Sequence, residues 1–252
     1  MIKDVENQPF EGIIVGRNPV LEALKGNRIE KILVAKGERE GTIIKIIAIA
    51  KSKGIVVVDT DRITLNNMSK MASHQGVAAF VTQKDYCEVE DIINYAKEKG
   101  EKPFIIIADG ITDPHNLGAI IRTADACGVH GIIIPKRRSV GMTAVVFKSS
   151  AGAAEHIRVA KVSNITNVID ELKVKGIWIF GADISGDTLY YQADYSCPCA
   201  LIVGSEGQGM SRLHKEKCDY LLKIPMKGEL SSLNASVASA ILMYEVLRKR
   251  NI

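Results

Sequence analysis

The sequence predicts an α/β fold built on a parallel sheet, preceded by a smaller α/β unit. Short apolar runs rich in Ile and Val alternate along the chain with segments whose apolar residues recur at helical spacing. The run Phe104–Ala108 is apolar at every position, which is typical of a parallel strand buried on both faces. A charge-rich stretch bounded by Gly100 and Pro103 separates the two units.

The leading unit spans residues 1–83, a plausible length for a small domain. Its expected elements are a helix over 18–25, a strand over 31–35, a helix over 42–53 and strands over 55–59 and 77–82. We place a linker at residues 84–103 and a second domain at residues 104–252.

The second unit repeats the alternation of strands and helices. The expected strands cover 104–108, 131–134, 177–182, 200–203 and 221–224, and the expected helices cover 117–127, 166–175 and 234–250. Such alternation predicts a parallel sheet with helices on both sides. Ligands of such sheets bind beyond the carboxyl ends of the strands. The turns at Asp109, Gly204 and Pro225 all follow strands, so we expect the binding site there.

Composition excludes several classes of protein. With 46% hydrophobic and 25% charged residues, the 252-residue chain is ordinary for a soluble globular protein. Its apolar runs fall short of the roughly 20 residues that span a bilayer, and its start lacks a signal-peptide core. The five cysteines have neither zinc-site nor redox spacing, and the five histidines form no HExxH motif. We therefore expect reduced thiols, no metal and a cytoplasmic location.

The formal net charge of +4 permits nucleic-acid binding without demonstrating it. In the loop Lys136-Arg137-Arg138, three adjacent cations repel one another unless an anion is near, so a phosphate contact and a solvated loop fit equally. The cations of Arg248-Lys249-Arg250 end the last helix, where solvated positive charge suits the helix dipole.

The glycine-rich turn after residue 203 invites a nucleotide-binding interpretation. Its spacing, Gly204-x-x-Gly207-x-Gly209, is not the GxGxxG of dinucleotide-binding proteins, and no GxxxxGK[ST] motif occurs. We therefore disfavour a dehydrogenase and a P-loop enzyme. Glu206 taken alone is an exposed turn carboxylate, but its glycine neighbours favour a hydrogen-bonding role for the loop.

Polar residues precede or begin two of the expected helices. Asn116 falls where a helix N-cap belongs, and Arg122 is spaced to pair with Asp125. Ser232 and Asn234 precede the last helix. Capping needs only one of these two side chains, which leaves the other free for function.

Three segments closely resemble the three motifs of the SpoU (TrmH-like) class of RNA ribose 2′-O-methyltransferases. They are DPHNLGAIIRTADACGVHGIIIP (113–135), LIVGSEGQGMSRL (201–213) with LLKIPM (221–226), and SSLNASVASAILMYEVLRKR (231–250). The resemblance covers residues 104–252 in composition, order and spacing. VGRNPVLEAL (15–24) and HQGVAA (74–79) resemble the family's L30e-like RNA-binding domain. The two-part layout is similar to the RlmB-type 23S rRNA guanosine 2′-O-methyltransferases.

This resemblance implies a SPOUT fold with a C-terminal trefoil knot, S-adenosylmethionine bound in the knot, and a homodimer. The implied catalytic residues are Asn116, Arg122, Glu206, Ser232 and Asn234. The implied cofactor-binding residues are Gly204, Ser205, Glu206, Gly207, Ile224, Met226 and Leu233. RNA binding is expected at Arg122, Lys136, Arg137 and Arg138.

The implied activity is methyl transfer to the ribose 2′-hydroxyl of a 23S rRNA guanosine. A tRNA substrate and a non-catalytic RNA-binding scaffold are the alternatives. A guanidinium hardly ever releases its proton, so Arg122 is a poor base. Our hypothesis is that Arg122 grips an RNA phosphate and polarises the 2′-hydroxyl, whose proton leaves through phosphate or water.

Overall fold

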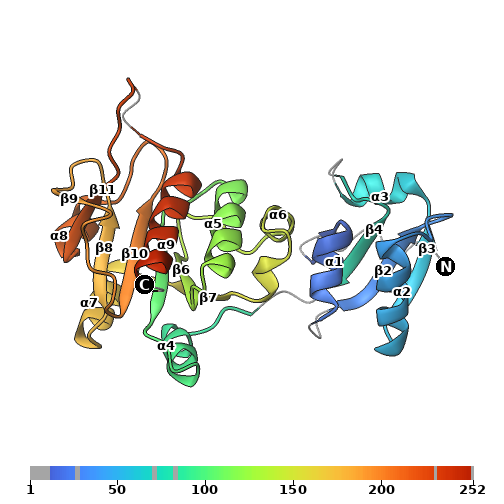
Figure 1. The fold of residues 1–252 in the computed structure, drawn as a ribbon. Helices are drawn as coiled ribbons and strands as arrows, with labels where there is room; N and C mark the ends of the chain where they lie inside the picture. The colour runs from blue at the N-terminus through green and yellow to red at the C-terminus, as the bar shows by residue number, and fades with distance from the viewer. Residues whose placement is uncertain (1–11, 26–28, 70–72, 82–84, 230–231, 251–252) are drawn as a thin grey trace. The chain divides into compact units, whose positions relative to one another are not determined.

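The computed structural model describes residues 12–25, 29–69, 73–81, 85–229 and 232–250, and these form two compact units (Figure 1). The first unit takes the described residues up to Asp85 together with Met142–Glu155, and the second takes the rest. The segment expected as a linker, 84–103, contains helix α4 (Val89–Glu98). Val89, Ile92 and Ile93 of this helix are buried in the core of the second unit.

The first unit is a mixed sheet of four strands in the order β1-β4-β2-β3. Its strands are β1 (Ile13–Val15), β2 (Ile29–Ala35), β3 (Val56–Thr60) and β4 (Val77–Val81). Its helices are α1 (Arg17–Ala23), α2 (Thr42–Ser52), α3 (Arg62–Met68), α6 (Ala144–Ser149) and the short η2 (Ala153–Glu155). Only β2 and β3 run parallel. The sequence did not predict β1, α3, α6 or η2, which are all short.

The second unit is a seven-stranded sheet in the order β7-β6-β5-β10-β8-β11-β9, and every neighbouring pair is parallel. Its strands are β5 (Phe104–Asp109), β6 (Gly131–Pro135), β7 (Arg158–Val162), β8 (Trp178–Ala182), β9 (Thr188–Leu189), β10 (Cys199–Gly204) and β11 (Tyr220–Lys223). The predicted α/β fold with a parallel sheet is confirmed. The outer strands β7 and β9 were missed because their residues are less apolar than those of the central strands.

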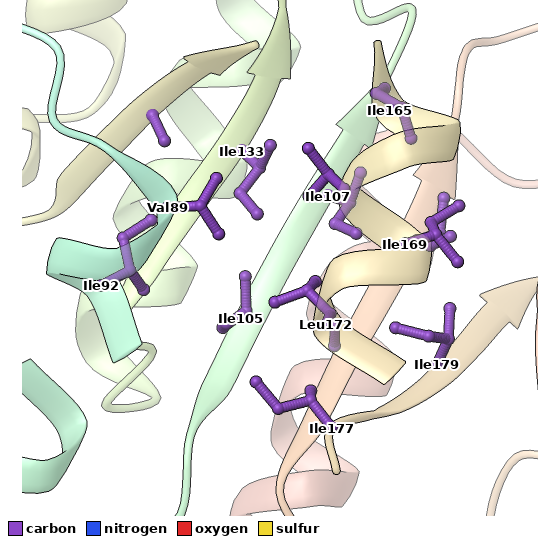
Figure 2. Close-up of a cluster of buried hydrophobic side chains, with 14 of the residues drawn as sticks. Val89, Ile92, Ile105, Ile107, Ile133, Ile165, Ile169, Leu172, Ile177 and Ile179 are labelled. Carbon is purple, nitrogen blue, oxygen red and sulfur yellow. The ribbon is translucent and has the colours of Figure 1, made fainter. Parts of the chain in front are cut away.

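Helices cover both faces of this sheet. On one face, α4 and α7 (Ile165–Val174) pack on Ile105, Ile107 and Ile133, and Figure 2 shows the resulting cluster of buried aliphatic side chains. On the other face lie α5 (Pro114–Ala126) and α9 (Ala235–Arg250), which pack against each other (Figure 1). Because both faces are covered, the buried positions of the central strands β5 and β10 are apolar.

The chain path creates a crevice at the carboxyl ends of β5 and β10. From β5 the chain passes through α5 to β6, on one side of the pair, whereas from β10 it passes through α8 (Arg212–Lys217) to β11, on the other side. Connections that leave in opposite directions open a ligand-binding crevice at that point of the sheet. After β11 the chain returns to α9, which packs against β10. The trefoil knot stays a prediction.

The C-terminal cation cluster differs from our expectation of a solvated helix end. The guanidinium of Arg250 donates hydrogen bonds to the carbonyl oxygens of Lys102, Pro103 and Cys197 at 2.9, 3.1 and 2.7 Å, and Nε donates to that of Tyr195 at 3.1 Å. The last turn of α9 is therefore tied to the segment that enters β5. The expectation failed because the spacing of cations along a helix does not show which loops lie beside its end.

The five cysteines are free thiols. Burial raises the pKa of Cys127 to about 11 and that of Cys199 to about 12, so both are protonated at neutral pH. In the part of the chain that the structure describes, no helix combines the length and apolarity required to cross a membrane.

Candidate functional site

Three polar side chains from distant parts of the sequence meet at the crevice. The Nδ2 group of Asn116 donates a hydrogen bond to Oε1 of Glu206 at 2.8 Å. The Nδ2 group of Asn234 donates to Oδ1 of Asn116 at 2.9 Å and also to Oε1 of Glu206. Each member of this cluster contacts the other two. All three were singled out from the sequence, and we call them the Asn-Glu-Asn cluster.

Asn234 also caps helix α9. Its Oδ1 accepts hydrogen bonds from the backbone N–H of Ser236 at 2.9 Å and of Val237 at 3.3 Å. The sequence suggested that the capping residue and the functional residue would be different, but Asn234 uses its oxygen for the cap and its nitrogen for the cluster. Glu206 accepts from the N–H of Ala235 at 3.4 Å, so its carboxylate lies at the positive end of the helix dipole.

Asn116 is not the N-cap of α5, which corrects the sequence assignment. Asp113 is the N-cap, and its Oδ1 accepts from the backbone N–H of His115 at 2.9 Å. Pro114 occupies the first helical position, where its missing N–H costs nothing. Asn116 therefore lies inside the first turn, where its buried side chain is free to bond across to Glu206.

The glycines of the β10 loop shape the turn that carries Glu206. A Cβ at Gly204 would lie 2.1 Å from the carbonyl carbon of Gly209, because the loop folds back on itself. The N–H of Gly209 closes the turn by donating to the carbonyl of Ser205 at 2.8 Å. Gly207 and Gly209 have φ angles of 82° and 64°, which favour glycine.

A polar cavity of about 900 Å³ opens beside the cluster. Asn116, Ser205 and Glu206 line it, together with Arg137 and Arg138 from the loop after β6. Arg138 has a φ of 59°, a conformation that bulky residues adopt rarely and that often marks a functional loop. Two guanidinium groups beside a polar cavity suit an anionic ligand such as a phosphate.

The structure adds a pair of residues that sequence reasoning missed. His214, on α8, places Nδ1 2.6 Å from Oδ2 of Asp109, the last residue of β5, and both line the cavity. The backbone N–H of Ser211 also donates to Oδ2 of Asp109, at 3.3 Å. The sequence placed the turn at Asp109 at the expected binding edge of the sheet but assigned no role to its side chain. Nothing in the sequence marked His214.

Other expected site residues are not part of this arrangement. Arg122 is exposed on α5, does not line the cavity, and has no hydrogen bond or ion pair with any residue that the structure describes. Ser232 is exposed, and Lys136 does not line the cavity. Ile224, Met226 and Leu233 lie outside the cavity lining, in the connection between β11 and α9.

That connection has the properties of a segment that can bind S-adenosylmethionine. Among the described residues, the peptide groups of 224–229 form no backbone hydrogen bonds and remain available for a ligand. Ile224 and Leu233 are half-buried and Met226 is 36% exposed, so apolar side chains stand beside these free peptide groups. Free peptide groups can form hydrogen bonds with the edge of an adenine, and apolar side chains can pack against its face. The carboxylate of Glu206 can attract a positively charged sulfonium. The residues present fit this cofactor.

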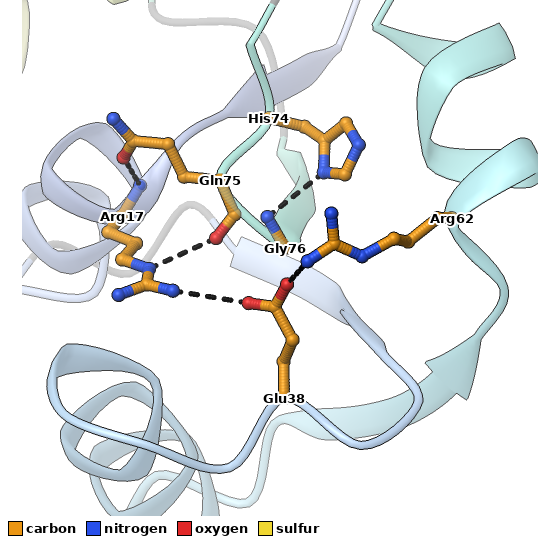
Figure 3. A network of polar contacts seen from close by, with 6 residues as sticks. All are labelled: Arg17, Glu38, Arg62, His74, Gln75 and Gly76. Carbon is orange, nitrogen blue, oxygen red and sulfur yellow. Dashed lines mark hydrogen bonds and ion pairs between the residues drawn. The ribbon is translucent and has the colours of Figure 1, made fainter.

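The first unit contains a second polar pocket, of about 630 Å³. Figure 3 shows Glu38 held between Arg17, which donates to Oε2 at 3.1 Å, and Arg62, which bonds Oε1. The backbone N–H of Arg17 donates a hydrogen bond to Oε1 of Gln75 at 3.0 Å, and Nε of Arg17 donates to the backbone carbonyl of Gln75, also at 3.0 Å. The segments 15–24 and 74–79, which the sequence analysis had connected with RNA binding, therefore meet in one pocket.

Comparison with known proteins agrees with this geometry. Residues 103–244 match the model of the SpoU rRNA Methylase family, which covers more than half of the chain. The chain belongs to this family. Residues 13–87 match a second model, described as RNA 2′-O ribose methyltransferase substrate binding. Members of the family are RNA methyltransferases that use S-adenosylmethionine, so this chain is an RNA methyltransferase with that cofactor.

Relatives resemble the chain over almost its whole length. It is 49% identical over 239 residues to YacO of Bacillus subtilis (strain 168), named as a TrmH family tRNA/rRNA methyltransferase, covering 94% of this chain and 96% of YacO. The solved structure of an RNA 2′-O ribose methyltransferase matches this chain with a TM-score of 0.77 at 26% identity. The match covers 95% of this chain and 89% of that one. The fold is shared with the SpoU methyltransferase AviRb of Streptomyces viridochromogenes, whose structure was solved with AdoMet. The TM-score is 0.80 at 24% identity, and the match covers 96% of this chain and 91% of AviRb.

Proposed function

We propose that this protein methylates the ribose 2′-hydroxyl of one guanosine in 23S rRNA, acting as a homodimer. The observation that carries the proposal is the Asn-Glu-Asn cluster at the rim of a cavity bearing Arg137 and Arg138. A solved relative of 26% identity is named an RNA 2′-O ribose methyltransferase, which supports the ribose as acceptor. The match of the first unit to a substrate-binding model of RNA 2′-O ribose methyltransferases supports RNA as the substrate.

Bound S-adenosylmethionine would supply an activated methyl group, held by Ile224, Met226, Leu233 and the Gly204–Gly207 turn. The remaining work of the protein is alignment, because fixing the acceptor in line with the methyl carbon can contribute several kcal/mol. Asn116 and Asn234 are held rigidly by Glu206 and by the cap of α9, so their amides form a fixed platform for the ribose.

Arg137 and Arg138 would bind RNA phosphates at the cavity, and Lys136 would add charge beside them. Arg17 and Arg62, in the pocket of the first unit, would provide a second contact with the RNA. Both contacts are electrostatic, so affinity for RNA is expected to fall with rising salt.

Arg122 would act on RNA bound to the partner subunit. Its side chain is exposed and lies outside the cavity of its own chain. It stands on α5 next to α9, whose surface carries the exposed apolar residues Val237 and Tyr244. In the proposed homodimer a second copy would cover these residues, and the guanidinium of Arg122 would bind a phosphate of the RNA held by that copy and polarise the 2′-hydroxyl.

Labelled methyl transfer tests the proposal directly. Total RNA from cells that lack this protein is incubated with the enzyme and a radiolabelled methyl donor, and the rRNA and tRNA fractions are separated. We expect label in 23S rRNA, and mass spectrometry of its digests should show one 2′-O-methylguanosine. Label on a base rather than a ribose would refute the proposal, and label in tRNA would move the substrate to that class.

A further inference from the structure

We infer that His214 is the catalytic proton acceptor for the 2′-hydroxyl and that Asp109 is its positioning residue. The inference rests on the proposed function and names the group that this function requires. The starting observation is the 2.6 Å contact between His214 Nδ1 and Asp109 Oδ2 in the same cavity that Asn116 and Glu206 line.

The contact determines which ring nitrogen accepts a proton. A carboxylate oxygen only accepts hydrogen bonds, so Nδ1 of His214 must be the donor toward Asp109. In the neutral imidazole, Nε2 then carries the free lone pair. No hydrogen bond links Nε2 to any of the residues that the structure describes. The carboxylate fixes tautomer and ring orientation, as it does in serine hydrolases.

The other side chains of the cavity are less suited to this role. Glu206 already accepts hydrogen bonds from both asparagines and from the backbone of α9. Oδ1 of Asp113 accepts from the N-terminal turn of α5, and a guanidinium does not lose its proton. Among the described residues that line the cavity, His214 alone has an imidazole, the group that exchanges protons near neutral pH.

The proton transfer completes a balanced reaction. As the 2′-oxygen bonds to the methyl carbon, the carbon–sulfur bond of the donor breaks and its electron pair stays on sulfur as a neutral thioether. The hydroxyl proton passes to Nε2 of His214, and the resulting imidazolium is stabilised by Asp109 and releases the proton to water. The charged groups that line the cavity with this ring are Asp109, Asp113, Arg137, Arg138, Glu206 and Arg212. The Sγ of Cys218 donates to the carbonyl of His214.

The test compares His214→Gln with His115→Gln, which removes an exposed imidazole outside the cavity. We expect His214→Gln to lower kcat by about 10²- to 10⁴-fold, the usual contribution of a general base, with KM for RNA within about threefold. The pH dependence of kcat should differ in shape between the wild type and the variant, because the variant has no imidazole to accept the proton. His115→Gln should retain the wild-type rate and pH profile.

A second readout does not use activity. Imidazole ¹⁵N shifts of the wild type should show Nδ1 protonated and Nε2 unprotonated. Asp109→Asn should shift the ring toward the opposite tautomer, because an amide can donate to Nδ1, and should lower kcat by up to about 10⁴-fold. An unprotonated Nδ1 in the wild type overturns the inference whether or not His214→Gln folds.

The outcomes separate this inference from the proposed function. If the wild type methylates ribose and folded His214→Gln does so within threefold, with an unchanged pH profile, only the assignment of the base is wrong. If the wild type transfers no methyl group to ribose, the proposed function fails and this inference fails with it.

Discussion

Nδ2 of Asn234 lies 2.9 Å from Oδ1 of Asn116, although 118 residues separate them in the chain. The first belongs to the turn that begins α9 and the second to the first turn of α5. Their contact exists only after the chain has returned from β11 to the centre of the sheet. The site is therefore assembled by the last segment of the domain.

We predict that Asn116 and Glu206 act as one unit. Asn116→Ala and Glu206→Ala should each lower methyl transfer about 10²-fold, which is typical for the loss of one oriented polar group in an active site. The double variant should lose little more, because either change alone breaks the cluster. Single-turnover rates give the comparison, and Glu171→Ala, an exposed carboxylate on α7, is the control. If the loss of activity in the double variant equals the product of the two single losses, Asn116 and Glu206 act independently and the prediction is wrong.

Arg122→Ala should abolish methylation while leaving cofactor affinity, measured by calorimetry, within a few-fold. Arg122→Lys should also be inactive, because an ammonium lacks the planar guanidinium geometry that binds a phosphate through two parallel hydrogen bonds. Loss of cofactor binding in Arg122→Ala would show instead that the residue is structural.

Mixed dimers test whether Arg122 acts across the subunit boundary. The Arg122→Ala subunit is expected to be inactive alone, and the Asn116→Ala subunit alone is expected to be about 10²-fold less active than the wild type. In a mixed dimer, the Arg122→Ala chain keeps an intact cavity and receives Arg122 from the other subunit, so activity should return. A mixture that stays inactive, although subunit exchange is verified, would place Arg122 at its own chain's site.

Arg250→Ala should destabilise the second unit by on the order of 2–3 kcal/mol, because carbonyl oxygens around Pro103 and Cys197 lose a charged donor. Lys249→Ala removes a cation from the same turn and should change the unfolding free energy by less than about 0.5 kcal/mol. Urea unfolding followed by circular dichroism measures both. Equal effects of the two changes would mean that only the charge of the helix end matters.

Stability should fall as the pH drops below about 6.5, in part because of His130. Nδ1 of this buried ring accepts from the N–H of Phe104 at 3.0 Å, and burial lowers the pKa of His130 against the opposing effect of Glu101. The unfolded chain therefore takes up the proton first, so the stabilisation is complete above pH 6.5 and is lost below it.

Thermal unfolding between pH 5 and 8 measures this dependence. In His130→Asn, an amide oxygen can still accept from Phe104 but does not titrate. We expect the melting temperature of the variant to depend less on pH than that of the wild type. Identical slopes would rule out a contribution from His130.

The layers of the fold and part of the site can be predicted from the amino-acid sequence alone. Runs such as Phe104–Ala108, apolar at every position, require a strand covered on both faces, and the glycines after residue 203 require a tight turn beside it. Such patterns are local consequences of burial and backbone geometry, so they can be read within a few residues. Glu206 lies in this glycine turn, whereas the functional roles of Asn116 and Asn234 came from the resemblance to the SpoU motifs.

Which of these residues contact one another depends on how the strands and helices are assembled in the folded protein. Asp109 and His214 are 105 residues apart, and their contact follows from the neighbouring positions of β5 and β10 in the sheet. Strand order leaves no periodic trace in a sequence, because the apolar run of a buried strand does not show which strands lie beside it. The contacts of Arg250 with carbonyl oxygens of distant segments were missed for this reason. So was the dual role of Asn234, whose oxygen caps α9 while its nitrogen bonds Asn116. Hydrogen bonds between distant segments depend on how the elements are assembled.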